Sequence, residues 1–378
     1  MAMRPYIGGY RLMRPSSSPH PFATRQDRLR ERMETHGLPL LLVTSLTNIF
    51  YLTGFRGSAG VAVLGPAEAL LWVDPRYTLQ AHEQARGVEV IEEKQGLLKA
   101  VAKWLRKGRV RRAAYEPAHM TCSDFERLAQ DTCSSVKFES SGDLIEELRE
   151  VKDDGEIAHI REAGRVTVEV FEEVIRQARP GVSESDLAAE IDYRMRKKGA
   201  EGAAFETIVT SGARGALPHA RASAKLLEKD ELVIVDLGAI LNGYAADMTR
   251  MIALGKPTRR ARSLYNAVLG AQGEALATLG EGVRAKEVDA AARRFLARRG
   301  VARYFTHSTG HGVGLEVHER PRLARGERAR VKAGCVVTVE PGIYLEGWGG
   351  IRVEDTVLVR SDGPEILTPA SKEQWVVA

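Results

Sequence analysis

The first third of the chain alternates short apolar runs with stretches in which apolar residues recur at helical spacing. Apolar runs at 40–44, 60–64, 69–73, 88–91 and 113–115 predict buried strands. Helical patterns lie between them at 76–86, 97–105 and 123–130, and Thr24-Arg-Gln-Asp27 resembles a capping box that would open an earlier helix ending at Gly37. This alternation predicts a three-layer α/β domain.

A change of pattern near Ser140-Ser141-Gly142 predicts a domain boundary. We expect a lead-in at 1–22, an N-terminal domain at 23–141, a linker helix at 142–152 and a second domain at 153–378. The second domain opens with a long helix through Gln177, whose predicted inner face has a period near 3.6 residues and comprises Ile157, Ile160, Val168, Phe171 and Ile175.

The stretch 231–250 joins a buried strand to two acids. Leu232 to Val235 is apolar and ends on Asp236, Asn242-Gly243 predicts a two-residue hairpin turn, and a second short strand is expected to carry Asp247. A carboxylate at the end of a buried strand is costly without a compensating positive charge. Two such carboxylates held close by a tight turn repel each other, so a divalent cation between them is the simplest remedy.

The features of the second domain recur once, in the same order. The segment 181–190 resembles 282–291, the strand 233–238 resembles 337–342, and Glu354 takes the place of Asp247. We therefore predict two related halves packed about a pseudo-two-fold axis, which would bring together the carboxylates of Asp236, Asp247, Glu340 and Glu354. The alternative is coincidence among common helix patterns.

A histidine lies between the two acid pairs in sequence, in the glycine-rich segment Thr309-Gly-His311-Gly-Val-Gly314. An isolated histidine is more often a packing residue, but this position makes it a candidate ligand. The five predicted metal ligands are Asp236, Asp247, His311, Glu340 and Glu354. Bridging acids would hold two ions about 3.5–4 Å apart, and we expect the water between the ions to be acidified and to act as the nucleophile. Mn²⁺, Co²⁺, Fe²⁺ and Zn²⁺ are compatible, and one imidazole among carboxylates favours Mn²⁺.

Composition excludes several other classes. The net charge of +5 is small for 378 residues and the basic residues are scattered, so we expect no nucleic-acid partner. No apolar run approaches membrane-spanning length, and residues 1–22 lack the apolar segment of a secretory signal. The three cysteines have no metal-type spacing. We expect a cytoplasmic protein with reduced thiols and no membrane partner.

Several motifs together carry a family resemblance. They are Val235-Asp236-Leu-Gly, Asp247-Met-Thr-Arg250, Gly310-His311-Gly through His318-Glu-Arg-Pro321, Val339-Glu340-Pro-Gly and Gly350-Ile-Arg352-Val-Glu354. This combination resembles the creatinase/methionine aminopeptidase ("pita-bread") metallopeptidase superfamily, in the branch of Xaa-Pro aminopeptidases and Xaa-Pro dipeptidases (prolidases). Tyr51-Leu-Thr-Gly54-Phe-Arg-Gly-Ser and Trp72-Val-Asp-Pro-Arg76-Tyr resemble the N-terminal domain of that branch. The resemblance implies an α/β creatinase-like N-terminal domain, an α+β pita-bread C-terminal domain with the internal repeat, and a homodimer or homotetramer.

The resemblance also implies a role for each matching residue. Asp236 would bind one ion, Asp247 and Glu354 would bridge both ions, and His311 and Glu340 would complete the other. Glu340 would also be the general base. His219, in Leu217-Pro218-His219, and His318 resemble substrate-side histidines that bind the scissile carbonyl or the leaving imino nitrogen. His307 resembles a third such histidine. Arg352 resembles an arginine near the substrate carboxylate, and a charge-balancing role beside the ligands is an equal alternative.

The leading hypothesis is a dinuclear metal-dependent exopeptidase of the aminopeptidase P type, which cleaves the N-terminal Xaa-Pro bond of peptides through a metal-bridging hydroxide. The alternative is an Xaa-Pro dipeptidase, so proline-containing peptides or dipeptides are the expected substrates. A methionine aminopeptidase is disfavoured by the N-terminal domain and by the surroundings of His219 and Arg352. A metal-free creatinase-like hydrolase and a non-catalytic binding module are disfavoured because all five ligands are present.

Overall fold

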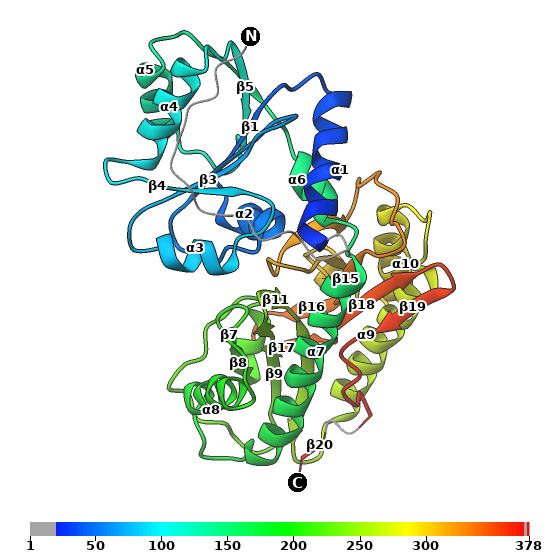
Figure 1. The fold of residues 1–378 in the computed structure, drawn as a ribbon. Coiled ribbons are helices and arrows are strands. Elements are labelled where there is room, and N and C mark those ends of the chain that lie inside the picture. The colour runs from blue at the N-terminus through cyan, green and yellow to red at the C-terminus, as the bar shows by residue number, and fades with distance from the viewer. Residues whose placement is uncertain (1–19, 374–375, 378) are drawn as a thin grey trace. The chain divides into compact units, whose positions relative to one another are not determined.

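The computed structural model describes residues 20–373 and 376–377 and divides into two compact units, one ending at Ile145 and the other beginning at Glu146 (Figure 1). Residues 1–19 of the expected lead-in lie outside the described residues. Among the described helices, none combines the length and the apolar character needed to cross a bilayer.

The first unit is a mixed six-stranded sheet with helices packed on it, which confirms the predicted α/β class. The strand order is β4-β3-β2-β1-β5-β6, with the β1–β2 and β2–β3 pairs antiparallel and the others parallel. The strands are β1 Leu41–Val43, β2 Val61–Leu64, β3 Ala69–Val73, β4 Glu89–Glu92, β5 Arg112–Tyr115 and β6 Lys137–Ser140. The helices are α1 Pro21–Thr35, α2 Leu46–Thr53, α3 Thr78–Gln84, α4 Leu97–Lys107 and α5 Cys122–Asp131, and α6 Leu144–Arg149 lies within the expected linker.

Three details of this unit differ from the sequence prediction. Helix α1 begins at Pro21, so the capping box at Thr24 was wrong; proline suits a first helical turn because the N–H it lacks has no partner there. Helix α2 was missed because its eight residues are mostly buried and show little periodicity, although Ser45 caps it and Gly54 ends it at φ 81°. Strand β6 was missed because its side chains are only partly buried.

The second unit contains two sets of helices and strands. Its helices are α7 Asp154–Val174, α8 Glu184–Lys197, α9 Arg259–Thr278 and α10 Ala285–Arg298, with 3-10 turns η1 Ile175–Gln177, η2 Gly212–Ala216 and η3 Ala302–Tyr304. The strands of the first set are β7 Gly202–Ala203, β8 Ile208–Ser211, β9 Leu232–Leu237, β10 Ala239–Leu241, β11 Tyr244–Ala245 and β12 Met248–Leu254. The later strands are β13 Gly310–Gly312, β14 Glu319–Leu323, β15 Val336–Val339, β16 Gly342–Leu345, β17 Gly349–Arg352, β18 Asp355–Arg360, β19 Gly363–Ile366 and β20 Val376–Val377.

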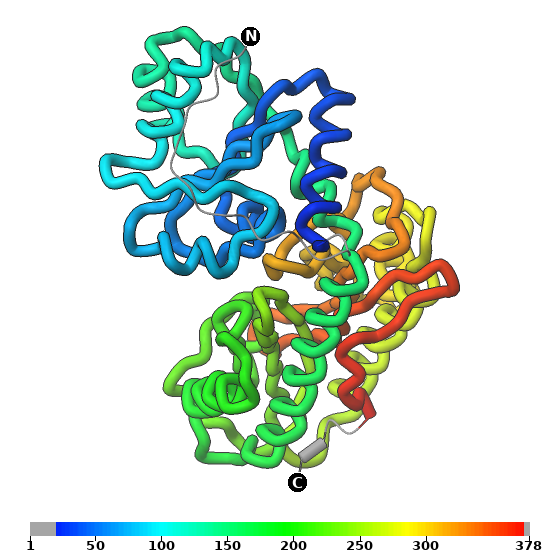
Figure 2. The backbone as a smooth tube through the Cα atoms, in the orientation of Figure 1, coloured from blue at the N-terminus to red at the C-terminus, as the bar shows by residue number. Residues whose placement is uncertain are grey.

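The strand pairing confirms the predicted internal repeat. In the first half β8, β9 and β12 are adjacent and antiparallel, and in the second half β13, β15 and β18 are adjacent and antiparallel. A two-stranded hairpin follows the middle strand in each half, β10/β11 after β9 and β16/β17 after β15. A helix pair precedes each set, α7/α8 and α9/α10, and the chain can be followed from green to red through both halves in Figure 2.

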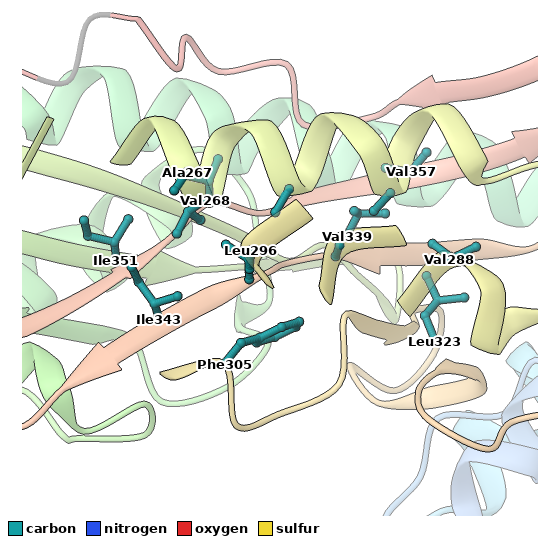
Figure 3. Close-up of a cluster of buried hydrophobic side chains, with 14 of the residues drawn as sticks. Ala267, Val268, Val288, Leu296, Phe305, Leu323, Val339, Ile343, Ile351 and Val357 are labelled. Atoms are coloured by element: carbon teal, nitrogen blue, oxygen red, sulfur yellow. The ribbon is translucent and has the colours of Figure 1, made fainter. Parts of the chain in front are cut away.

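A buried apolar cluster fixes the second half. Ala267 and Val268 of α9 face the strands that carry Val339, Ile343 and Ile351 (Figure 3). Each of these side chains is at most 4% exposed. This packing makes a rigid base for the ends of β15 and β17, where three of the predicted site residues lie.

Candidate metal centre

Strand pairing brings the acids of the first half together. Asp236 lies in β9 directly opposite Thr249 of β12. Asp247 lies in the short segment between β11 and β12, and not within a strand as predicted. The turn before it is the predicted one: Asn242 and Gly243 both have positive φ, 50° and 82°, as a type I′ hairpin requires.

The second half repeats this geometry. Glu340 directly follows β15, and Glu354 lies between β17 and β18, as Asp247 lies between β11 and β12. One ligand atom each of Asp247, His311 and Glu354 lie within 4.8 Å of one another, and all three residues are buried. Nε2 of His311 lies 3.3 Å from Oε1 of Glu340 and 3.7 Å from Oδ2 of Asp247.

The donor set fits divalent cations. Oδ1 of Asp236 is buried and has no hydrogen-bond partner among the described residues. Nδ1 of His311 donates to the carbonyl oxygen of Gly312 at 3.1 Å, so in the neutral ring the lone pair of Nε2 faces the carboxylates. A buried carboxylate oxygen and an imidazole lone pair turned toward other acids are stable only with a cation or protons between them.

The electrostatics of the metal-free chain lead to the same conclusion. Burial raises the pKa of Asp247 well above its ordinary value, and the charges of Glu354, Asp236 and Glu340 raise it further. Burial likewise raises the pKa of Glu354. Burial lowers the pKa of His311, but the contact with Glu340 outweighs it and raises that pKa, which favours a proton on Nε2 while no metal is bound. Burial also opposes the charge of Glu340, but the hydrogen bond from this protonated ring outweighs it and lowers the pKa of Glu340 to about 2. The cluster therefore holds protons that a metal ion would have to displace.

Arg352 is bound by protein groups on every side. Its side chain is 4% exposed, and its guanidinium pairs with Oδ2 of Asp236. Nε donates to Oγ1 of Thr249 at 2.9 Å, and Nη1 donates to the carbonyl oxygen of Pro218 at 3.1 Å and to the hydroxyl of Tyr344 at 2.9 Å. This geometry favours the charge-balancing alternative over direct contact with substrate.

Sequence analysis missed three buried threonines that orient the acids. The hydroxyls of these residues donate as follows: Thr249 to Glu354 Oε2, Thr338 to Glu340 Oε1, and Thr356 to the backbone carbonyl of Asp247. Each of the three lies two residues from a predicted ligand. The repeated spacing of a threonine two residues from each of three predicted ligands was a usable signal in the sequence.

The three predicted histidines lie in different surroundings. The half-buried ring of His307 contacts the hydroxyl of Tyr344 through Nε2 at 3.0 Å, and its Nδ1 lies 3.9 Å from Oε2 of Glu340. The ring of His318 packs against that of His311 with centroids 4.3 Å apart. His219 is exposed, and its charge contributes to lowering the pKa of both His307 and His318, for which burial is the largest cause.

The segment before His219 is pressed against β17. A Cβ added at Gly350 would lie 2.0 Å from the carbonyl oxygen of Gly215, so the two backbones meet where no side chain fits. Together with the bond from Arg352 to Pro218, this contact holds the residues before His219 beside the acid cluster.

Comparison with known proteins agrees with this geometry. The profile of metallopeptidase family M24 matches residues 158–361, and the profile of the creatinase/prolidase N-terminal domain matches residues 25–151. An Xaa-Pro dipeptidase from Pyrococcus horikoshii is 33% identical over 92% of this chain and 97% of its own length.

Solved structures match over almost the whole chain. An Xaa-Pro dipeptidase from Bacillus anthracis is 36% identical, with a TM-score of 0.91 over 94% of this chain and 100% of the other. An X-Pro aminopeptidase from Thermotoga maritima is 37% identical, with a TM-score of 0.86 over 93% and 100%.

Proposed function

The chain belongs to metallopeptidase family M24, and from this premise we propose that it is an Xaa-Pro dipeptidase. The metallopeptidase part of this proposal is supported by the meeting of Asp247, Glu340 and Glu354 around His311. Asp236 is linked to the same group through Arg352 and Thr249. The names of the relatives support the dipeptidase alternative better than the leading hypothesis of an aminopeptidase P. The cytoplasmic location and the homodimer or homotetramer stay predictions.

Asp236, Asp247, His311, Glu340 and Glu354 would hold two divalent ions, for which we propose Mn²⁺. Such ions supply Lewis-acid activation of the scissile carbonyl and of water. The buried threonine hydroxyls keep the acids in place, and Arg352 balances part of their charge.

The proton transfers of the reaction would be carried out by the protein's own side chains. The carboxylate of Glu340 would accept a proton from the attacking water. An Xaa-Pro bond has no amide hydrogen, and its nitrogen leaves only after it gains a proton. The imidazoles of His219 and His318 would donate to the scissile carbonyl and to that nitrogen, and His307, whose ring is fixed by Tyr344, would line the same side.

The position of Arg322 favours a dipeptide over a longer peptide as the substrate. Arg322 lies on β14 four residues after His318, and its charge adds to burial, the largest cause, in lowering the pKa of that histidine. A dipeptide ends in a carboxylate directly after its proline, and an exposed arginine there would bind it by charge-assisted hydrogen bonds.

Cleavage of an Xaa-Pro dipeptide and of Xaa-Pro-Yaa-Zaa should be measured after EDTA treatment and after readdition of Mn²⁺. We expect EDTA to abolish activity, Mn²⁺ to restore it, and the dipeptide to be preferred. Activity indifferent to the chelator would contradict a metal-dependent mechanism. Preference for the longer peptide would favour the aminopeptidase.

A further inference from the structure

A buried ionic cluster lies next to the segment that carries His318 and outside the metal centre. Its members are Glu319, whose side chain is 5% exposed, and two cations, Arg149 and Lys152, whose side chains are 2% and 1% exposed. Nζ of Lys152 lies 3.2 Å from Oε2 of Glu319, and the guanidinium of Arg149 contacts Oε1. Burial opposes the charge of Glu319, but the two cations outweigh it and hold its pKa below the ordinary value.

The carboxylate of Glu319 closes the loop that precedes it. The backbone N–H of Glu316 donates to Oε1 of Glu319 at 3.0 Å, and the N–H of Gly314 donates to the carbonyl oxygen of Glu316 at 3.1 Å. A Cβ at Gly314 would lie 2.6 Å from Oε2 of Glu319, so the carboxylate packs directly on the glycine backbone. His318 is the last residue of this closed loop.

Both ends of the loop are tied to the metal centre. Glu319 pairs with Gly312, the residue after the predicted ligand His311. The carbonyl oxygen of Gly314 accepts a bond of 2.8 Å from the N–H of Ala245, which lies two residues before Asp247. The ring of His318 thus packs against His311 at the end of a loop to which the Glu319 carboxylate is hydrogen-bonded.

Stability alone does not explain this cluster. A buried ion pair is on average no more stabilising than well-packed apolar residues, because desolvation offsets its attraction. What fixed charges supply is a defined geometry for the groups around them. We propose that Glu319, held by Arg149 and Lys152, is a positioning residue that sets the place of the His318 imidazole relative to the metal centre.

This inference rests on the proposed catalytic role of His318. A double-mutant cycle distinguishes failure of that role from failure of the positioning role of Glu319. The variants are Glu319→Gln, His318→Ala and the double variant, with kcat and KM for an Xaa-Pro dipeptide measured in saturating Mn²⁺. We expect His318→Ala to lower activity, Glu319→Gln to lower kcat about 10- to 100-fold, and Glu319→Gln to add less than about twofold in the His318→Ala background. Metal content should be unchanged in all three.

The matched control is Glu316→Gln. Glu316 contacts the same guanidinium at 2.6 Å but its side chain is 43% exposed, so we expect kcat within about twofold of wild type. Full activity of His318→Ala would overturn the proposed function of that histidine. Activity losses that multiply in the double variant, or an equal loss in Glu316→Gln, would overturn the positioning role alone.

If Glu319→Gln does not fold, Lys152→Gln gives the same test, because it removes one cation and leaves Arg149 in contact with Glu319. We expect a smaller loss of kcat that again disappears in the His318→Ala background. Loss of the same size in both backgrounds would overturn the proposal.

Discussion

Replacing Arg352 with methionine should destabilise the metal-free protein strongly. Arg352 is 3% exposed and Asp236 8%, so the substitution leaves a buried carboxylate without its cation and removes donors to Thr249 and Tyr344. Breaking a buried pair from one side costs about 3–5 kcal/mol. For a unit of this size, 1 kcal/mol corresponds to about 2–4 °C, so we expect Tm to fall by about 6–20 °C.

The assay is thermal unfolding followed by circular dichroism, in EDTA and in saturating Mn²⁺. Because bound ions would replace the lost positive charge, the difference between wild type and Arg352→Met should shrink in Mn²⁺. The control is Arg161→Met, whose pair with Glu365 is 47% and 33% exposed and should contribute under about 1 kcal/mol. A shift in EDTA no larger than that of the control would refute a charge-balancing role for Arg352.

Two further outcomes follow from the site. The pKa values of Asp247 and Glu354 are raised, chiefly by burial, so protons bound to these carboxyl groups stabilise the metal-free fold at low pH, and that stability is lost as pH rises through the raised values. The Tm difference between Mn²⁺ and EDTA should therefore widen as pH rises above the ordinary carboxyl range of about 4. A constant difference would contradict this. Gly310→Ala should lower the amount of bound Mn²⁺, measured by metal analysis, because the new Cβ would lie 1.9 Å from the carbonyl oxygen of Thr338, beside His311. The control is Gly273→Ala, on an open face of α9. This variant should keep its metal, and its free energy of unfolding should rise by about 0.5–1 kcal/mol.

Sequence predicted the acid cluster because its signals are local. Each signal can be read from neighbouring residues: a buried strand that ends on an acid, an Asn-Gly turn, and the same order of features in both halves. Strand pairing then determines which acids meet. These signals predict that the five residues meet, and the strand pairing agrees with the predicted repeat.

The contacts that sequence did not predict are those between distant segments. The bond from Arg352 to Pro218 and the pairing of Arg149 with Glu319 join residues far apart in the chain, and no periodicity marks them. The error at Thr24 has a different cause, because a proline at Pro21 opened the helix before the polar residues could cap it.

The pseudo-two-fold arrangement of the acids is broken by one imidazole. In the second half β13 carries His311, whereas the corresponding strand β8 of the first half, Ile208–Ser211, carries aliphatic and hydroxyl side chains. The duplicated fold would thus offer two unequal ion-binding sites, one with oxygen ligands alone and the other with a nitrogen ligand as well. Ions would then fill the pair in sequence, and partial occupancy would be the normal state at low metal supply.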